Sequence, residues 1–186
     1  MVFYGVIAAG ALALAAIIWI YNLLVRRWQL VNNGWADIDV QLKRRSDLIP
    51  RLVEIVSGYA AHERATLEEV VEKRVLAEAA GEDPERRGAA ESELSKPVAK
   101  LLAIAEAYPD LKADRNFSQL HSELVEAENK IEMARRFYNG AVRELNTLAQ
   151  SFPVNFVAGA MGFAQRPYFE IEPVERVAPQ VELTRS

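Results

Sequence analysis

Side chains suited to acid–base or metal chemistry are present, but their spacing matches no catalytic or metal-binding motif. His62 lacks the second histidine, four residues on, that a metalloprotease helix carries. Neither His62 nor His121 follows a glutamate by three residues, as a di-iron bundle requires. The chain also lacks cysteine, which excludes disulfides and thiolate chemistry. We therefore expect no catalytic residue, no metal site, no cofactor and no enzymatic activity.

Arg45 interrupts an apolar helical stripe and is the most informative polar side chain. Read every third or fourth residue, the stripe contains Val31, Trp35, Ile38, Leu42, Arg45, Ile49, Leu52, Val56 and Tyr59. A charge that faces a core must be paired, and an antiparallel neighbouring helix would bring Glu128 opposite Arg45. The candidate interhelical polar site comprises Gln41, Arg45, Glu128, Asn129 and Arg135.

A second interpretation of Arg45 is that a bend at Pro50 rotates the stripe and lets the guanidinium reach water. We expect Leu42→Ala to destabilise the protein by about 2 to 5 kcal/mol and Arg45→Ala to destabilise it less. Lys43 and Arg44 complete a basic run with Arg45. This run lies too far from the apolar N-terminal segment to bind lipid headgroups, so we interpret it as a solvated helix face.

The charge balance argues against nucleic acid as a partner. The formal net charge is -4 at pH 7, and all of it lies after Val25. Affinity for nucleic acids rests on Lys and Arg that neutralise phosphates, so an acidic domain is poorly suited to it.

An uncharged segment, Val2 to Val25, reads VFYGVIAAGALALAAIIWIYNLLV and exceeds the ~20 residues that a helix needs to cross a bilayer. A cleaved signal peptide fits less well, because no basic region precedes the apolar run. Arg26 and Arg27 follow the segment, and the positive-inside rule then places the N-terminus outside and the domain in the cytoplasm. We expect a single-pass protein of the cell (inner) membrane.

Helical patterns continue beyond this anchor. Asn32 to Gly34 could loosen its joint with the domain, and Gly58 is either a chain reversal or an interior helical glycine. A second helical pattern runs from residue 59 to 80, and a loop is expected from Gly81 to Gly88. A shorter stripe from Leu94 to Tyr108 follows, and we expect its helix to start or bend at Pro97.

The longest regular pattern lies between Phe117 and Leu148 and predicts a helix in a bundle or coiled coil. Its apolar positions are Phe117, Leu120, Leu124, Ala127, Ile131, Ala134, Tyr138, Ala141, Leu145 and Leu148. The pair Phe152 and Pro153 should end this helix.

Similar helix lengths predict an all-α fold, in which a transmembrane helix leads into an antiparallel up-down four-helix bundle. The alternative is a kinked long hairpin, with residues 26–80 running against 90–150. The expected domains are an anchor over residues 1–25, a bundle over 26–165 and an extended or disordered tail over 166–186.

The segment VNFVAGAMGFA, residues 154–164, is apolar and too short to span a bilayer. It either caps the end of the bundle or lies in the membrane interface. The residues of the candidate membrane-interface segment are Val154, Phe156, Val157, Met161 and Phe163.

Four blocks of the sequence resemble the bacterial LemA family. They read WADIDVQLKRRSDLIPRLVEIVSGYAAHE (35–63), EAYPDLKADRNFSQL (106–120), ENKIEMARRFYNGAV (128–142) and FPVNFVAGAMGF (152–163). The resemblance implies a membrane-anchored helical bundle inside the cell, without an established activity, cofactor or substrate. Pro97 departs from the family pattern, in which a helix-friendly residue is expected.

These observations predict a non-enzymatic interaction or scaffolding protein at the inner face of the cell membrane. Its expected partners are the lipid bilayer and either another protein or a second copy of the chain. The alternative is a lipid- or ligand-responsive membrane module that uses the apolar segment 154–164.

Overall fold

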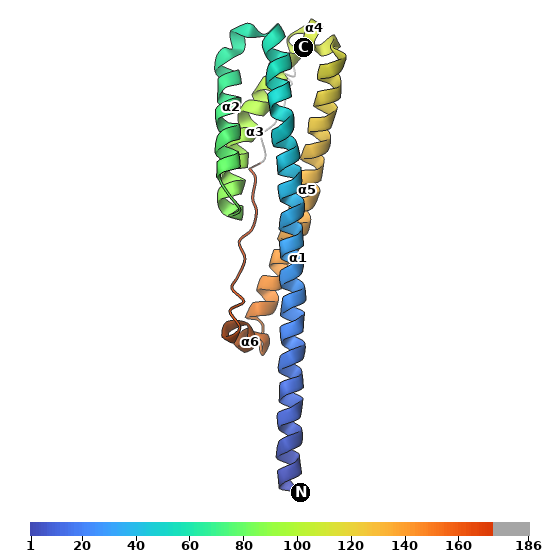
Figure 1. The fold of residues 1–186 in the computed structure, drawn as a ribbon, viewed down its shortest axis with the longest axis vertical. Coiled ribbons are helices and arrows are strands. Elements are labelled where there is room, and N and C mark those ends of the chain that lie inside the picture. The colour runs from blue at the N-terminus through green and yellow to red at the C-terminus, as the bar shows by residue number, and fades with distance from the viewer. Residues whose placement is uncertain (173–186) are drawn as a thin grey trace, which may run out of the picture.

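The computed structural model describes residues 1–172, and this part of the chain is helical, without a strand. One very long helix, α1 (Val2–Tyr59), runs the length of the molecule (Figure 1). The elements that follow are η1 (Ala61–Glu63), α2 (Arg64–Ala79), α3 (Pro84–Glu106), α4 (Pro109–Ala113), α5 (Arg115–Gln150) and α6 (Val154–Ala160). The prediction of an all-α chain with a long apolar N-terminal helix is confirmed.

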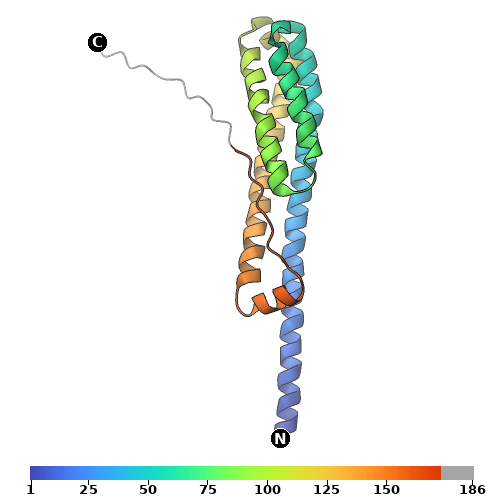
Figure 2. The same cartoon turned by 90° about the vertical axis from the view of Figure 1, so that its left-hand side faces the viewer.

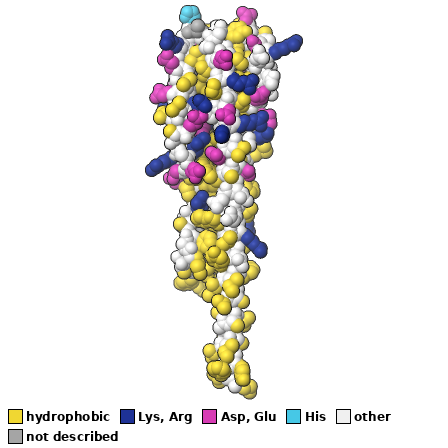
Figure 3. Space-filling model, viewed as in Figure 1, with side chains coloured by type: hydrophobic (Ala, Val, Ile, Leu, Met, Phe, Trp, Pro, Cys, Tyr) yellow, Lys and Arg dark blue, Asp and Glu magenta, His cyan; other side chains and the backbone are white. Residues whose placement is uncertain are grey.

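The apolar end of α1 projects alone beyond the other helices (Figure 1). Every residue from Met1 to Trp19 is exposed. In Figure 3 this end carries no charged side chain, whereas Lys, Arg, Asp and Glu gather over the opposite half of the molecule. This part of α1 is long and apolar enough to cross a membrane.

Helix α1 continues without a break through Asn32–Gly34, where the sequence predicted a loose joint. Gly34 is instead a packing residue. A Cβ atom at this position would lie 3.1 Å from the Phe137 ring and 3.1 Å from the Tyr138 Cα of α5. The glycine therefore allows α1 and α5 to approach each other closely.

Pro50 also lies within α1, and the helix continues through it to Tyr59. Proline has no backbone N–H, so the carbonyl of Ser46, four residues earlier, loses its usual helical partner. Arg74 of α2 replaces that partner, because its Nε donates to the Ser46 carbonyl at 2.9 Å and to the Ser46 hydroxyl at 3.0 Å. The proline site thus forms part of the α1–α2 contact.

The chain reverses directly after Gly58, which itself lies in the last turn of α1. The helix ends at Tyr59, and the N–H of Ala60 donates to the Val56 carbonyl at 2.8 Å. The chain then turns through η1 into α2. Residues 26–80 are therefore two helices, and the alternative prediction of one long kinked helix is wrong.

Helix α3 begins at Pro84, so the predicted start at Pro97 and the predicted loop as far as Gly88 are wrong. Asp83 caps the helix by accepting a hydrogen bond from the Arg86 N–H at 2.9 Å, and a proline suits the first helical position. Gly88 is buried inside α3. A Cβ there would lie 2.3 Å from the carbonyl oxygen of Glu170. Gly88 therefore leaves room for the backbone at Glu170 to pass against α3.

Helix α5 confirms the long apolar pattern and ends before Phe152 and Pro153, as predicted. Asp114 caps it and accepts hydrogen bonds from the N–H groups of Asn116 at 2.7 Å and Phe117 at 3.2 Å. The fully buried residues of its stripe include Leu120, Ala127, Tyr138 and Leu145.

Helices α1, α2, α3 and α5 lie side by side in the half of the molecule far from the N-terminus (Figure 2). Their core is the distal cluster, which includes Ile49, Leu52, Val70, Leu101 and Leu120. Nearer the apolar end, α1, α5 and α6 enclose the proximal cluster, which includes Leu24, Ile38, Tyr138, Leu145 and Phe169. Residues 164–172, here called the strap, run in extended conformation from α6 back along α3 and α5 (Figures 1 and 2). The rest of the predicted tail lies outside the described residues.

Candidate functional site

Four charged side chains meet where the distal and proximal clusters join, and we call them the charge layer: Arg45, Arg87, Glu91 and Glu128. Arg45 is only 1% exposed. Its Nη1 donates to Glu128 Oε1 at 2.6 Å, and its Nη2 donates to Glu91. Arg87 Nε donates to the other oxygen of Glu91 at 2.8 Å. The layer is electrically balanced, with two cations and two carboxylates.

Three helices supply the charge layer: α1 gives Arg45, α5 gives Glu128, and α3 gives Arg87 and Glu91. On α1, Arg45 lies between Leu42 of the proximal cluster and Leu48 of the distal cluster. The charge layer thus lies at the boundary between the distal and the proximal apolar clusters. Arg45 does not reach water, in contrast to the interpretation based on a bend at Pro50.

Arg45 is a fixed positive charge rather than an acid–base group. Burial by itself lowers the pKa of the guanidinium. The negative charges of Glu128 and Glu91, together with their hydrogen bonds to Arg45, outweigh this effect and raise the pKa above its usual value. Arg45 therefore contributes a permanent positive charge to the layer.

The other residues of the predicted polar site lie apart from the charge layer in the described part of the chain. Gln41 is half-buried one turn before Arg45, and its Oε1 has no hydrogen-bond partner among residues 1–172. Asn129 is exposed on α5. Arg135 points to the strap, where its Nη1 donates to the Ile171 carbonyl at 3.1 Å. The structure thus brings Arg45 and Glu128 together but not the whole predicted set.

Glu91 was not among the predicted residues, although its carboxylate is 2% exposed and contacts both arginines. Gly88 and Pro97, on either side of it, suggested a loop and a late helix start. A signal was nevertheless present, because Asp83 followed by Pro84 is a typical helix start. A helix that begins there places Arg87 and Glu91 one turn apart on the same face.

Two asparagines of α5 hold the strap by its backbone. Asn139 Nδ2 donates to the Phe169 carbonyl at 2.9 Å, while Asn139 Oδ1 accepts from the Phe169 N–H at 3.0 Å. Asn146 makes the same pair of bonds with Arg166, both at 2.9 Å. Seven residues of helix and three of extended chain both span about 10 Å, so the two asparagines match the strap in a single register.

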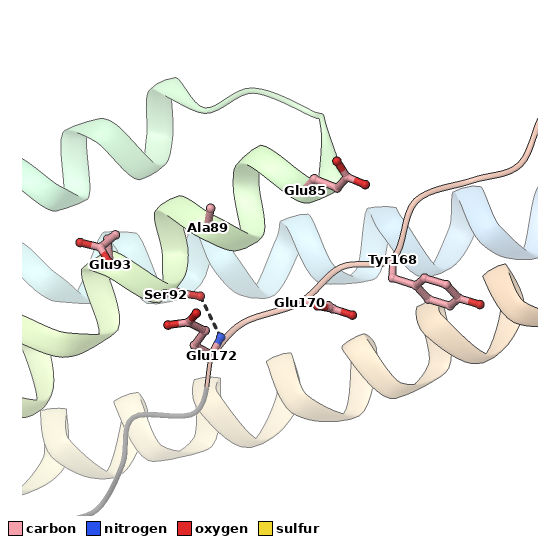
Figure 4. A pocket seen from close by; sticks show the side chains of 7 residues that line it. All are labelled: Glu85, Ala89, Ser92, Glu93, Tyr168, Glu170 and Glu172. Atoms are coloured by element: carbon pink, nitrogen blue, oxygen red, sulfur yellow. Dashed lines mark hydrogen bonds between the residues drawn. The ribbon is translucent and has the colours of Figure 1, made fainter.

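Side chains fix the strap at further points. Phe169 is fully buried, and its ring centroid lies 5.6 Å from that of Trp35. The Tyr138 hydroxyl donates to the Pro167 carbonyl at 2.9 Å. At the far end of the strap, the Glu172 N–H donates to Ser92 Oγ at 2.9 Å (Figure 4). The strap therefore connects α6 with the part of α3 that carries Glu91.

Two open grooves flank the strap. The first, of about 470 Å³, is lined by Glu85, Ala89, Ser92, Glu93, Tyr168, Glu170 and Glu172 (Figure 4). The second, of about 640 Å³, lies between α3 and α5, and its polar lining includes Glu128, Asn129, Glu132 and Arg135. Glutamates make up most of the first lining, which suits a positively charged binding partner. The second lining is mostly apolar and includes Val98, Leu102, Leu124 and Ile131. Residues 1–172 hold no group of three or more side chains placed to bind a metal ion.

The apolar segment after α5 has two faces. Val154 is 8% exposed and packs in the proximal cluster, and Val157 and Phe163 are half-buried against it. Phe156 and Met161 point away from the protein and are 68% and 54% exposed. The segment thus covers the end of the bundle with one face and leaves the other free.

Residues 34–183 match the model of the LemA family, which accounts for most of the chain. The chain belongs to the LemA family. The resemblance carried by the four sequence blocks is thereby confirmed. Together with the apolar α1, LemA membership indicates a membrane-associated protein.

Named relatives of this LemA-family chain come from three bacteria. Magnetosome protein MamQ 2 of Paramagnetospirillum magneticum is 23% identical, over 86% of this chain and 68% of its own length. Magnetosome protein MamQ of Magnetospirillum gryphiswaldense is 22% identical, over 82% and 65% of the two lengths. Protein LemA of Metamycoplasma hominis is 26% identical, over 84% and 71%. None of these names states a reaction or a substrate.

Proposed function

We propose that this LemA-family protein is a membrane-anchored, non-enzymatic interaction or scaffolding protein at the inner face of the cell membrane. The observation that carries this proposal is the continuity of α1. Residues 1–19 have no protein around them, whereas from Val31 onward the same helix forms the spine of the domain. In this proposal, α1 holds the part of the protein in which α1, α2, α3 and α5 lie side by side at a fixed height above the bilayer, where it can bind a partner.

The grooves beside the strap are the surfaces that best fit such a partner. Glu85, Glu93 and Glu170 line the groove in Figure 4, and its lining among residues 1–172 includes no arginine or lysine, although Lys96 Nζ pairs with Glu93 at 2.7 Å. A partner protein or a second copy would place basic side chains there, because opposite charges guide association and set its orientation.

Photo-crosslinking in living cells tests this proposal. A photo-reactive amino acid at Tyr168, which lines the acidic groove and is 41% exposed, should give a discrete adduct with a partner or with a second copy. Val75 of α2, 54% exposed and outside both groove linings, is the matched control position and should give little of that adduct. The absence of a discrete adduct at Tyr168, or equal adducts at both positions, would contradict the proposal.

A second candidate is a lipid- or ligand-responsive module that uses residues 154–164. The strap supports this candidate. It follows α6 in the chain, and its last residue, Glu172, is bonded to Ser92, which is next to Glu91 in α3. A change at α6 would therefore reach the charge layer through the backbone of residues 164–172. Hydrogen exchange of the Phe169 and Glu172 amides, compared in nanodiscs of neutral and anionic lipid, would detect such a response. Identical exchange in both lipids would count against this candidate.

A further inference from the structure

The level at which α1 leaves the membrane follows from its sequence. The first residues after Met1 are apolar, and about 20 residues of helix cross the hydrocarbon core. The run has no charge before Arg26, and Trp19 and Tyr21 are the aromatic residues near its charged end, so we place the inner boundary of that core near Tyr21. Trp19 and Tyr21 are exposed at this level, as interfacial aromatic residues are, and Arg26 and Arg27 are the first charges beyond it.

Helix α6 is fixed to this same turn of α1. Val154 and Ala158 belong to one cluster with Ile20 and Leu24, the first buried residues of α1. The Phe163 ring centroid lies 6.0 Å from that of Tyr21 and 5.9 Å from that of Trp28. Wherever Tyr21 lies relative to the bilayer, α6 lies beside it, because Phe163, Val154 and Ala158 pack around this turn. Figure 1 shows α6 next to α1, where the apolar end of α1 begins to project alone.

The free face of α6 is apolar and large. Phe152 is 81% exposed, Phe156 68% and Met161 54%, and the two phenylalanine rings contact each other edge to face at 6.0 Å. Residues 151–165 contain no charge, and the next charged side chain is Arg166, whose guanidinium lies 4.7 Å above the Trp28 ring. This face would be in unfavourable contact with water if the bundle stood away from the membrane.

We propose that α6 is a second membrane-contacting element, in which Phe152, Phe156 and Met161 insert among the headgroups and upper acyl chains of the leaflet below the bundle. The occupant of this face is lipid, because the face continues the apolar surface of α1 at the depth where that helix leaves the bilayer. The end of the domain formed by α1, α5 and α6 then stands directly on the membrane. This inference rests on the membrane anchoring of the proposed function.

Single-cysteine variants of the full-length protein test the contact, since the chain has no cysteine of its own. Phe156→Cys and Met161→Cys carry an environment-sensitive fluorophore, and the protein is reconstituted into phosphatidylcholine–phosphatidylglycerol nanodiscs. Nitroxide lipids labelled at the headgroup or deep in the acyl chain serve as quenchers. Leu12→Cys, in the apolar end of α1, is the control for anchoring, and Met133→Cys, 62% exposed on α5, is the matched control in water.

We expect probes at 156 and 161 to be blue-shifted relative to position 133, and to be quenched several-fold more by the headgroup nitroxide. The probe at position 12 should respond most to the deep nitroxide. If positions 156 and 161 behave like 133 while position 12 is quenched, anchoring stands and the α6 inference fails. If position 12 is not quenched either, the anchoring itself is wrong. Blue-shifted but unquenched probes at 156 and 161 would mean that protein covers this face, which also overturns the inference.

Discussion

Single residues of the charge layer determine how α1, α3 and α5 align. Desolvation offsets most of the attraction within a buried ion pair, so such a pair adds little net stability over an apolar core. Its effect on alignment is larger, since sliding α1 along α5 by one turn toward Leu124 would take the buried Arg45 away from Glu128, its α5 partner. The layer thus favours one register of the bundle.

Arg45→Ala should destabilise the protein by about 3 to 5 kcal/mol, because it leaves the buried Glu91 carboxylate without one of its two arginine partners. Leu42→Ala should cost about 2 to 5 kcal/mol. The two ranges overlap, so the order expected from the sequence, with Arg45→Ala the milder change, stays a prediction that the measurement decides. Chemical unfolding of the full-length protein in detergent, followed by circular dichroism, measures both values.

Arg44→Ala is the matched control for Arg45→Ala. Arg44 and Glu126 form an exposed pair at 3.5 Å, and such pairs contribute at most about 1 kcal/mol. Equal losses for the two arginine variants would show that Arg45 is not the buried partner that the structure describes.

Asp114 links the end of α1 to the start of α5 and should confer acid sensitivity. The Tyr59 hydroxyl, which donates to its carboxylate at 2.9 Å, and the N–H groups of Phe117 and Asn116 lower the pKa of Asp114. Because the folded pKa lies below the unfolded value of about 3.9, this contribution is complete above that value and is lost as the pH falls through the folded pKa. The thermal midpoint of the parent protein should therefore fall in acid.

Asp114→Asn should flatten that fall, since an amide still caps the helix but does not titrate. The comparison is made by thermal scans below about pH 5. Asp37→Asn, at an exposed aspartate of α1, serves as the control and should keep the parental dependence. A parallel decline in all three proteins would exclude Asp114 as the source.

Among the helices, the periodic ones were predictable from the sequence and the contacts made through glycine and proline were not. The stripe of α5 repeats over its whole length, so local pattern defines the helix. The heptad register of two antiparallel helices is also sufficient to place Glu128 opposite Arg45. Glycine is also typical of hinges and loops, so the sequence alone does not show what Gly34 and Gly88 do. The structure shows that the backbones of Tyr138 and Glu170, respectively, approach them closely.

Gly88→Ala should detach the strap without unfolding the bundle. The new Cβ would lie 2.3 Å from the Glu170 carbonyl oxygen, and backbone atoms cannot rotate away as a side chain does. Hydrogen exchange of the Phe169 and Glu172 amides should accelerate, because both are bonded only while the strap is in place.

Gly140→Ala is the matched control, because a Cβ at this helical position meets nothing within 4 Å. It should leave strap exchange unchanged and raise stability by up to about 1 kcal/mol through helix propensity. Unchanged strap exchange in Gly88→Ala would refute the close approach at this position.

For the whole molecule, the proposed orientation predicts opposite labelling of its two ends. A membrane-impermeant maleimide applied to intact cells should label Val2→Cys, outside the membrane, and should leave Met133→Cys unlabelled until the cells are permeabilised. The reason is the placement of Arg26 and Arg27, because basic residues beside a membrane span favour the cytoplasmic side. Labelling of position 133 in intact cells would reverse the orientation.

Because α1 has no joint at Gly34, the proposed membrane span and the rest of α1 would tilt together as one rigid rod. The part of α1 from Leu24 to Tyr59 is about 53 Å long at about 1.5 Å per residue. A tilt of about 20°, typical of membrane helices, moves the Tyr59 end sideways by about 18 Å. Tilt depends on the match between apolar length and bilayer thickness. A change in membrane thickness that alters the tilt would therefore move the Tyr59 end of α1 sideways by a much larger distance than the change itself.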